Sequence, residues 1–308
     1  MKIGNYTPSY LESAMRAEGY TDLQNLDATE LAAQENQKVV DLVSNRVFSC
    51  VSEPNSVNMW EFIFIPNFGF LSGADPLLTD CQLKLKFVRA KPDVAFINVL
   101  DTDKLETLDI TDCTVTTEMI SSPALRSHVR TDTKPYLYQY EDVAVKIFPL
   151  PSNVTNFRVD NCFGGNLPKY LFAGVIETAR LDGDLKTSST KFEVNNIIEF
   201  DIMVSGVSVN GYPIKLLNGS SIKPYHKFLD TTGRLCSLES SESINLQDFK
   251  KNFLWSHKFE AEGTEGFISI GGKLSTAYTS ANMSLVVWSV YPYAVSVDKF
   301  NQIEKIQL

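Results

Sequence analysis

The 308-residue sequence lacks any long run of positively charged residues. Its formal net charge at pH 7 is -9, and its longest run of Lys or Arg is the pair Lys250 and Lys251. Sequence-independent binding to DNA or RNA depends on clustered Lys and Arg that face phosphates. We therefore expect no direct nucleic-acid binding.

Closely spaced cysteines are also absent. The chain has five cysteines, an odd total with no C-x-x-C pair: Cys50, Cys81, Cys113, Cys162 and Cys236. This spacing disfavours a zinc site or a disulfide framework, and it predicts buried free thiols in a reducing compartment. We expect no bound metal.

Long apolar runs are missing as well. No stretch approaches the ~18 apolar residues of a membrane-spanning helix, and the start, "MKIGNYTPSYLES", lacks the apolar core of a secretory signal. We expect no membrane insertion and a chain that is made inside the cell.

The sequence has few groups for catalysis. Its three histidines are His128, His226 and His257, and no G-x-S-x-G elbow marks a nucleophilic serine. Acidic pairs occur where turns are expected, and we interpret them as solvated: Asp182 with Asp184, Asp101 with Asp103, and Glu239 with Glu242. We predict a protein that is not an enzyme, with no catalytic, cofactor-binding or metal-binding residues.

The segment "NCFGGNLPKYLFAGVIE", residues 161–177, invites a phosphate-loop interpretation. A phosphate loop needs a helix after its glycines, and it usually carries G-K-[ST]. Here Gly164 and Gly165 precede an apolar segment typical of a strand, and Lys169 follows a proline. The pattern instead predicts a turn at the glycines, an entry fixed by Pro168, and a strand with Gly174 at a bulge or close contact.

The first 48 residues have helical signals. Pro8, with Ser9 and Glu12 at capping-box spacing, predicts a short helix that ends near Gly19. Residues 27–47, "DATELAAQENQKVVDLVSNRV", carry an apolar stripe at helical spacing and predict a second, longer helix. We expect a helical N-terminal arm over 1–48.

From Trp60 onward, short segments rich in β-branched and aromatic residues alternate with turns rich in Gly, Asn, Asp and Pro. The segments that predict strands are "WEFIFIP", "CQLKLKFVRA", "DVAFINVL", "CTVTTEMI", "DVAVKIFPLP", "KYLFAGVIET", "NIIEFDIMVSGVSV", "EGFISIGGKLSTAY" and "MSLVVWSVYPYAVSV". With no helices between them, they favour an all-β fold, a jelly-roll type antiparallel β-sandwich over 49–308.

Several of these segments carry more detailed expectations. "CQLKLKFVRA" alternates, which predicts a half-buried strand with Leu83, Leu85 and Phe87 inward. "NIIEFDIMVSGVSV" is apolar at nearly every position, which predicts a strand covered on both faces. The stretches 121–142 and 226–253 are longer than hairpin turns and predict surface loops, with one short helix within "SINLQDFKKN".

Aromatic residues concentrate in "YLYQY", 136–140, and "WSVYPYAV", 288–295. Such residues stack on sugar rings in carbohydrate-binding sandwiches, or fill a core and an intersubunit contact. The sequence leaves both roles open, and the alternation around Trp288 favours core and contact.

The order of the segments resembles a known family. "CQLKLKFVRAKPDVAFINV", "CTVTTEMISSPALRSHVR", the stretch from "VAVKIFPLP" through "LPKYLFAGVIETARLDGDLKTS", "IIEFDIMVSGVSVNGYPI" and "MSLVVWSVYPYAVSVDKFNQIEKI" are similar, in that order, to jelly-roll capsid proteins of Maverick/Polinton-type and related double-stranded DNA viruses and elements, with their metazoan relatives. The nearest match is "LPK", Leu167 to Lys169, followed by the strand 170–178.

The resemblance implies a viral or virus-derived structural capsid protein that self-assembles into capsomers of an icosahedral shell. The implied partners are copies of the chain, in trimers, pentamers or hexamers, and other capsid proteins, within a virion assembled inside the host cell. Many relatives carry a further β half before the matching part, so a single jelly roll fits this length better than a double one. A β-sandwich module that binds a glycan or receptor is the alternative function.

Overall fold

The computed structural model describes residues 84–88, 91, 112–115, 136–183, 187, 191–192, 196–216, 222–233, 246–251, 253–259, 265–278, 282–297 and 302–307. The arm expected over 1–48, its boundary with the β domain, and the strands expected at "WEFIFIP" and "DVAFINVL" lie outside these residues. The division of the chain at residue 48 therefore stays a prediction.

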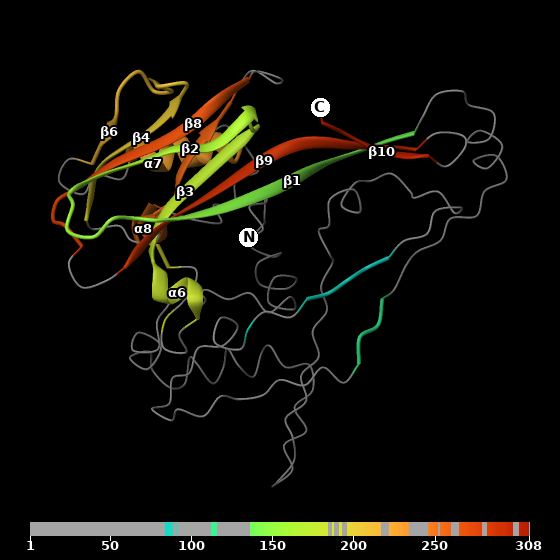
Figure 1. Ribbon diagram of the computed structural model, residues 1–308, viewed down its shortest axis with the longest axis horizontal. Coiled ribbons are helices and arrows are strands. Elements are labelled where there is room, and N and C mark those ends of the chain that lie inside the picture. The colour runs from blue at the N-terminus through green and yellow to red at the C-terminus, as the bar shows by residue number, and fades with distance from the viewer. Residues whose placement is uncertain are drawn as a thin grey trace, which may run out of the picture.

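The regular elements described by the structure are ten strands and three helices (Figure 1). The strands are β1 Tyr136–Pro149, β2 Asn156–Asn166, β3 Tyr170–Glu177, β4 Ile197–Val204, β5 Val207–Ser208, β6 Ile214–Lys215, β7 Trp255–Lys258, β8 Glu265–Leu274, β9 Met283–Val297 and β10 Ile303–Gln307. The helices are α6 Thr178–Asp182, α7 Ile222–Thr231 and α8 Leu246–Lys251.

The strands form two antiparallel sheets, in which early strands of the chain pair with late ones. Sheet A has the order β1-β9-β3-β7, with β10 also on β9, and sheet B has the order β2-β8-β4-β5, with β6 also on β4. The chain thus pairs its first strand with β9, its second with β8, its third with β7 and its fourth with β5 and β6. This rolled arrangement of antiparallel pairs over two layers is a jelly roll, which confirms the expected fold class.

Apolar side chains from both sheets meet between the layers. The rings of Phe200 on β4 and Trp255 on β7 stack with centroids 4.2 Å apart and an angle of 6° between their planes. Helices α7 and α8 extend this core: Phe228 on α7 lies 6.4 Å from Phe172, and Phe249 on α8 lies 5.0 Å from Phe253. All six aromatic side chains in these contacts are buried, which fixes the helices against the sandwich.

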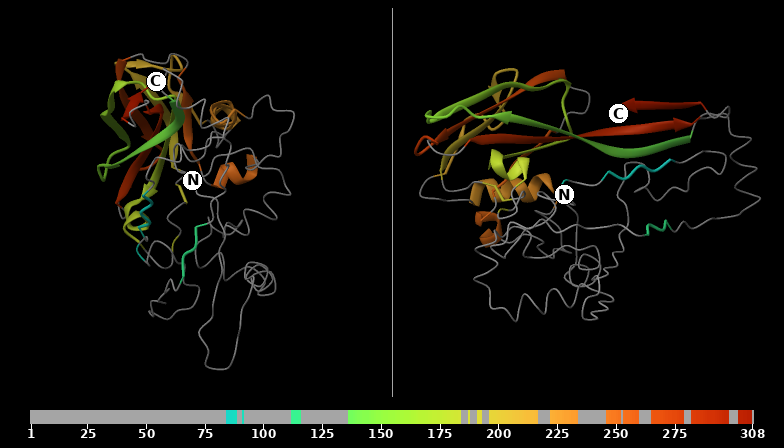
Figure 2. Two further views of the ribbon diagram at one scale, coloured as in Figure 1. Left: turned by 90° about the vertical axis from the view of Figure 1, so that its right-hand side faces the viewer. Right: turned by 60° about the horizontal axis from the view of Figure 1, so that its bottom comes forward.

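Strands β1 and β9 are longer than the sandwich that they help to build. They pair over their full lengths, from Tyr136 opposite Val297 to Pro149 opposite Ser284. Where β3 no longer accompanies β9, β10 pairs with the last residues of β9 instead. The result is a three-stranded extension that projects beyond the two layers, visible in Figure 1 and in the right-hand view of Figure 2.

Two strand predictions are wrong for the residues that the structure describes. Residues 84–88 and 112–115 have no strand, and Phe87 is exposed rather than inward. Alternation favours an extended backbone, but a strand also needs a hydrogen-bonded neighbour, which local sequence does not specify. Leu83 lies outside the described residues.

Other boundaries differ from the prediction. Strand β2 was not expected, and Gly164 and Gly165 lie within its paired end instead of in a turn. The predicted continuous strand at 196–209 is a β4–β5 hairpin that turns at Ser205 and Gly206, both with positive φ. It is not covered on both faces, because β4 mixes buried with half-buried residues and Val207 is 71% exposed. Thr178, expected to end the strand 170–178, and Asp182, expected in a turn, are instead the first and last residues of the single-turn helix α6.

The long connections also contain more regular structure than predicted. Tyr136–Tyr140 begin β1 instead of belonging to a surface loop, and α7 and β7 lie in stretches expected to be irregular or unassigned. The short helix expected within "SINLQDFKKN" is confirmed as α8. Gly174 pairs in register with Val286, so it makes no bulge, but a Cβ there would lie 2.6 Å from Cδ1 of Phe192, which confirms the predicted close contact.

Adjacent glycines in β8 provide a matched test of the core. A Cβ on Gly272 would lie 2.6 Å from Cε1 of Phe157, whereas the nearest atom to a Cβ on Gly271 would be Cε of Met203 at 3.4 Å. We predict that Gly272→Ala lowers the free energy of unfolding by about 1–3 kcal/mol, because the Phe157 ring must move. Gly271→Ala should change it by less than ~0.5 kcal/mol. Urea denaturation followed by tryptophan fluorescence measures both, and equal effects would contradict the close packing.

Candidate assembly surface

An apolar stripe lies on strand β1, at one end of sheet A. Val143, Val145 and Ile147 point to the same face of the strand and are 54%, 50% and 54% exposed. We call these three residues the β1 stripe. Exposed apolar side chains are ordinary when single, but a row of three on an edge strand is typical of a surface that contacts another chain.

The sequence of β1 reverses the usual alternation of a half-buried strand. The residues on its inner face at this point are Ala144, Lys146 and Phe148, and of these Phe148 packs against the core. Lys146 places its Nζ 4.8 Å from the centroid of the Phe163 ring on β2. The β-branched residues therefore point to the outer face of β1, and the exposed Ala144 and Lys146 point to the opposite face, so the outward orientation of the β1 stripe is built into the strand.

The same outer face of sheet A is covered over parts of β3 and β9. Ile176, Val286 and Leu254 are buried there in a small cluster with Phe192, and the rings of Phe192 and Trp288 meet edge to face at 5.4 Å. Among the described residues, this cluster includes none from β1. The β1 stripe thus lies beside a packed part of this face and is itself exposed.

Two ion pairs hold β1 where it leaves the sandwich. Lys305 on β10 donates to Oδ2 of Asp142 at 2.7 Å, and Lys169, next to β3, donates to Oε1 of Glu141 at 2.9 Å. The hydrogen bonds to these carboxylates raise the pKa of Lys305 and of Lys169. Because Glu141 and Asp142 point to opposite faces, β1 is held from both sides.

The tyrosines of the extension contact one another and Lys305. The rings of Tyr140 and Tyr293 stack at 5.9 Å, and Nζ of Lys305 lies 3.9 Å from the centroid of Tyr293. Tyr138 is 4% exposed and Tyr136 is 36% exposed. A sugar-binding platform needs open ring faces, so this arrangement favours the contact role of these tyrosines over the glycan-binding one.

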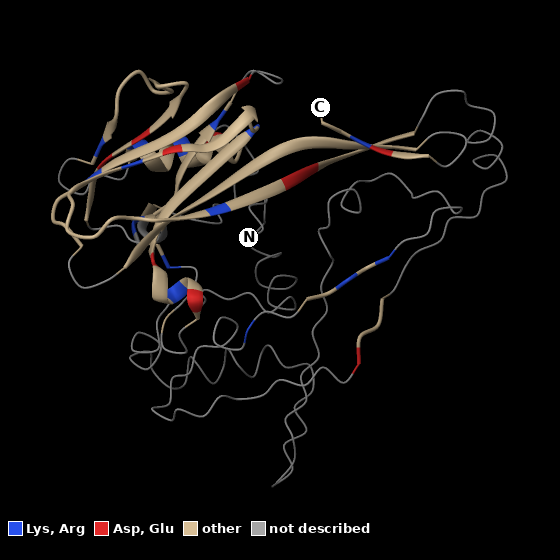
Figure 3. Cartoon of the chain, in the orientation of Figure 1, with Lys and Arg blue, Asp and Glu red and all other residues tan. Residues whose placement is uncertain are grey.

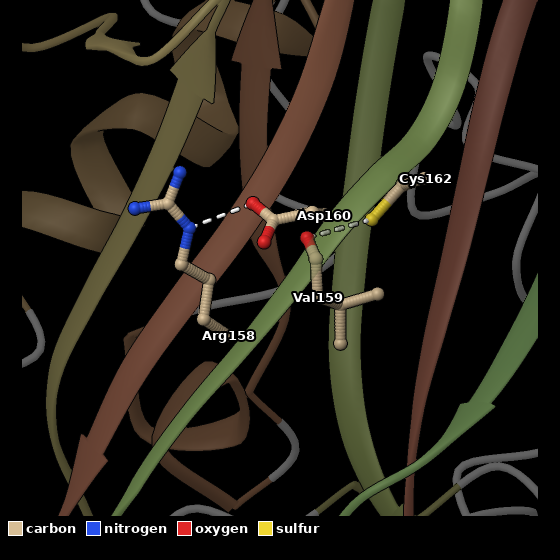
Figure 4. Close-up of polar contacts among 4 residues, drawn as sticks. All are labelled: Arg158, Val159, Asp160 and Cys162. Atoms are coloured by element: carbon tan, nitrogen blue, oxygen red, sulfur yellow. Dashed lines mark hydrogen bonds and ion pairs between the residues drawn. The ribbon is translucent and has the colours of Figure 1, made fainter.

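The glycine-containing segment that suggested a phosphate loop is a bulged strand. In β2, the pairing with β8 shifts between Val159 and Phe163, and Asn161 has a positive φ of 54°. Figure 4 shows the bulge: Arg158 donates to Asp160 at 2.7 Å, and the thiol of Cys162 donates to the carbonyl of Val159 at 3.5 Å. Lys169 is paired with Glu141, not directed at the glycines.

The two described cysteines differ in their surroundings. Cys162 is buried in the core, as predicted for the thiols, and burial raises its pKa to about 11, which keeps the thiol protonated. Cys113 is exposed, so the prediction of a buried thiol is wrong there. Cys50, Cys81 and Cys236 lie outside the described residues.

The sequence-derived candidates for chemistry are not brought together. His226 is exposed on α7, His257 is half-buried on β7, and Asp182 is exposed at the end of α6. His128, Asp184 and the acidic residues at 101, 103, 239 and 242 lie outside the described residues. Within the part of the chain that the structure describes, no three His, Cys, Asp or Glu side chains are grouped to hold a metal ion, and no helix is long and apolar enough to span a membrane.

No protein-family model matches the chain, and no curated protein is similar to it in sequence. The solved structures that it resembles include three from viruses. The mavirus major capsid protein shares 8% identity at a TM-score of 0.35, over 61% of this chain and 44% of that one. A chain of the Sputnik virophage shares 12% identity at a TM-score of 0.34, over 56% of this chain and 39% of that one. The PBCV-1 virus capsid shares 8% identity at a TM-score of 0.31, over 58% of this chain and 54% of that one.

The chain therefore spans between 39% and 54% of the length of these proteins. At such TM-scores the likeness adds nothing to what the strand order already shows. The fold is a jelly roll. It is the fold that the resemblance to jelly-roll capsid proteins implies, and it is established by the order of strands in the two sheets.

His257 makes the stability of the domain depend on pH. Burial, with a smaller contribution from the charge of Lys227, lowers its pKa to about 4, so the folded state favours the neutral ring. The unfolded chain takes up a proton near pH 6.5. Stability should thus be greatest above pH 6.5 and fall as the pH is lowered from 6.5 towards 4. We predict that His257→Gln reduces the loss of melting temperature between pH 7 and pH 5, whereas His226→Gln, at an exposed position, leaves it unchanged.

Proposed function

We propose that the chain is a structural capsid protein, viral or virus-derived, that self-assembles into capsomers of an icosahedral shell of a double-stranded DNA virus or element. The observation that carries the proposal is the β1 stripe, a row of three exposed apolar side chains on an edge strand of the described jelly roll. A folded edge with uncovered apolar side chains fits a protein that is completed by neighbours.

Assembly would proceed by symmetric burial of this surface. Removing apolar area from water contributes about 25 cal/mol per Å², so modest contacts repeated over many subunits stabilise a shell. We infer a trimer, pentamer or hexamer as the capsomer, with other capsid proteins as further partners and the virion as the location. The N-terminal arm, residues 1–48, would reach neighbouring subunits, while 49–308 would form the shell domain.

The charge distribution supports a role in the shell rather than in direct genome binding. Figure 3 shows Lys and Arg isolated from one another along the described strands, with Asp and Glu between them. Several of these charges are already paired within the chain, including Lys169 with Glu141 and Lys305 with Asp142. A shell protein of this kind would leave the genome to other components.

The β1 stripe can be tested without disturbing the core. We expect Val145→Ser with Ile147→Ser to raise the protein concentration needed for half-assembly at least tenfold, since each 1.4 kcal/mol of lost association free energy is a factor of ten. The folded monomer should change by less than ~0.5 kcal/mol because both positions are exposed. Sedimentation velocity and negative-stain electron microscopy measure assembly.

Val207→Ser is the matched control for this experiment. Val207 is 71% exposed at the β4–β5 turn, away from β1, so its replacement should leave assembly unchanged. If unaltered protein stays monomeric at high concentration across salt and pH, and no particle contains it, the proposed function is wrong.

The N-terminal arm gives a second test. Deleting Met1 to Val47 should block assembly while leaving the jelly roll folded, because all the described strands lie after residue 135. Circular dichroism reports the folding of the truncated chain, and electron microscopy reports particles. Normal particles from the truncated chain would show that the arm has no role in assembly.

A further inference from the structure

Strand β1 has one edge that pairs with no other strand among the described residues. It is the last strand of sheet A on its side, and it pairs with β9 at 14 consecutive positions without a register shift. The opposite edge of such a strand presents alternate N–H and C=O groups that another strand can bind. Regular edges without a bulge are the ones best suited to such pairing.

We propose that β1 pairs antiparallel with β1 of a second copy across a two-fold axis at Ala144, which joins the two A sheets into one. This inference rests on the proposed function, since it names the partner of the β1 surface. In an antiparallel pair, directly opposed residues point to the same face of the sheet. A two-fold axis normal to the sheet keeps each residue on the same face in both copies, so a residue can oppose only itself or one an even number of positions away. The axis must therefore lie at a residue position, where that residue opposes its own copy.

The axis at Ala144 makes β1 complementary to itself. Asp142 of each copy then faces Lys146 of the other, which gives two opposite-charge pairs on the inner face. Val143 of each copy faces Val145 of the other, which gives two apolar pairs on the outer face. Cross-strand pairs of these kinds stabilise antiparallel sheets. The small Ala144 side chain opposes its own copy at the axis.

Neighbouring registers lack this complementarity. An axis at Asp142 or Lys146 opposes like charges, which destabilises the pair. An axis at Val143 leaves Lys146 opposite Tyr140 and Asp142 opposite Ala144, and one at Val145 sets Asp142 against Phe148. Among these registers, the one centred on Ala144 is favoured by charge.

Existing contacts of the two charged residues are compatible with this pairing. Asp142 binds Lys305 through Oδ2, so its Oδ1 can accept from another lysine. Lys146 is exposed, and its ammonium group lies over the Phe163 ring without an ion pair among the contacts of the described residues. Each carboxylate would then lie between two lysines, one from its own chain and one from its partner.

The other end of sheet A does not offer an equivalent edge. Strand β7 has only four residues and lies beside α7. A head-to-tail contact of β1 with β7 would pair a long strand with a short one, and repeating it would give an open fibre. Pairing β1 with itself closes as a dimer, which can serve as a contact within or between capsomers.

Cysteine cross-linking tests the register. We expect Ala144→Cys in the full-length chain to form a disulfide dimer on mild oxidation with diamide, because directly opposed residues have Cα atoms ~4.5–5.5 Å apart, within disulfide reach. Val145→Cys is the matched control and should link at least tenfold less. Peptide mass spectrometry identifies the 144–144 link and separates it from links through native cysteines.

Charge exchange tests the same pairing without oxidation. Lys146→Asp alone and Asp142→Lys alone each oppose like charges, so each should weaken the dimer about tenfold. Mixing the two variants restores both opposite-charge pairs in a heterodimer, and we expect dimerisation to return to within about threefold of the original. Asp142→Lys also removes the contact with Lys305. In the mixture one of the two subunits still lacks this contact, so a recovery of dimerisation would show that its loss is not the cause of the weakening. Circular dichroism checks that each variant is folded.

The results separate this inference from the proposed function. Capsomers or shells without a 144–144 link, or with a dominant 145–145 link, would overturn the inference and leave the proposed function intact. A 144–144 dimer that never enters a particle would support the inference and count against the proposed function. Failure of the mixed variants to recover dimerisation would also overturn the register.

Discussion

Strand β9 is the constraint on which the sheet A half of the molecule depends, because it pairs on both of its edges. One edge carries β1 along the whole strand, and the other carries β3 and then β10. Its inward side chains, such as Leu285 and Val287, are buried between the layers, while Val286 is buried under the outer cluster. With β9 fixed on both faces, the position and orientation of β1 follow from the register alone.

The ion pairs near Glu141 and Asp142 act on this framework in a local way. Exposed pairs contribute at most about 1 kcal/mol each, so they do not hold the fold together. Their value is geometric: one lies on each face of β1 at the point where the strand leaves the sandwich, and each reaches a different element. Together with the tyrosine contacts of Tyr293, they set the direction in which the extension projects.

Part of this architecture could be predicted from sequence, for identifiable reasons. Strands β3 and β9 are dense in apolar β-branched and aromatic residues, so their propensity and their burial agree. Strand β2 was missed because its bulge and its two glycines interrupt the pattern, and the pairing with β8 overrides local preference. The β1 stripe could not be predicted either, although its segment was predicted as a strand. "VAVKI" looks like an ordinary strand, and only the neighbours of the strand reveal that its β-branched side chains face outward. A candidate surface made of edge residues depends on tertiary arrangement, which no local motif encodes.

The arrangement of β1 and β9 has a consequence for how the protein is made. Asp142 and its partner Lys305 are 163 residues apart in sequence, and β1 leaves the ribosome long before β9 and β10. Closing so long a loop is slow, and sheet A cannot form until the last part of the chain is synthesised. Until then β1 has both edges and its apolar side chains open, which is a state prone to non-native association. The order of synthesis thereby couples the completion of each subunit to its readiness for assembly, because the surface of β1 takes its final orientation only when the C-terminal strands are in place.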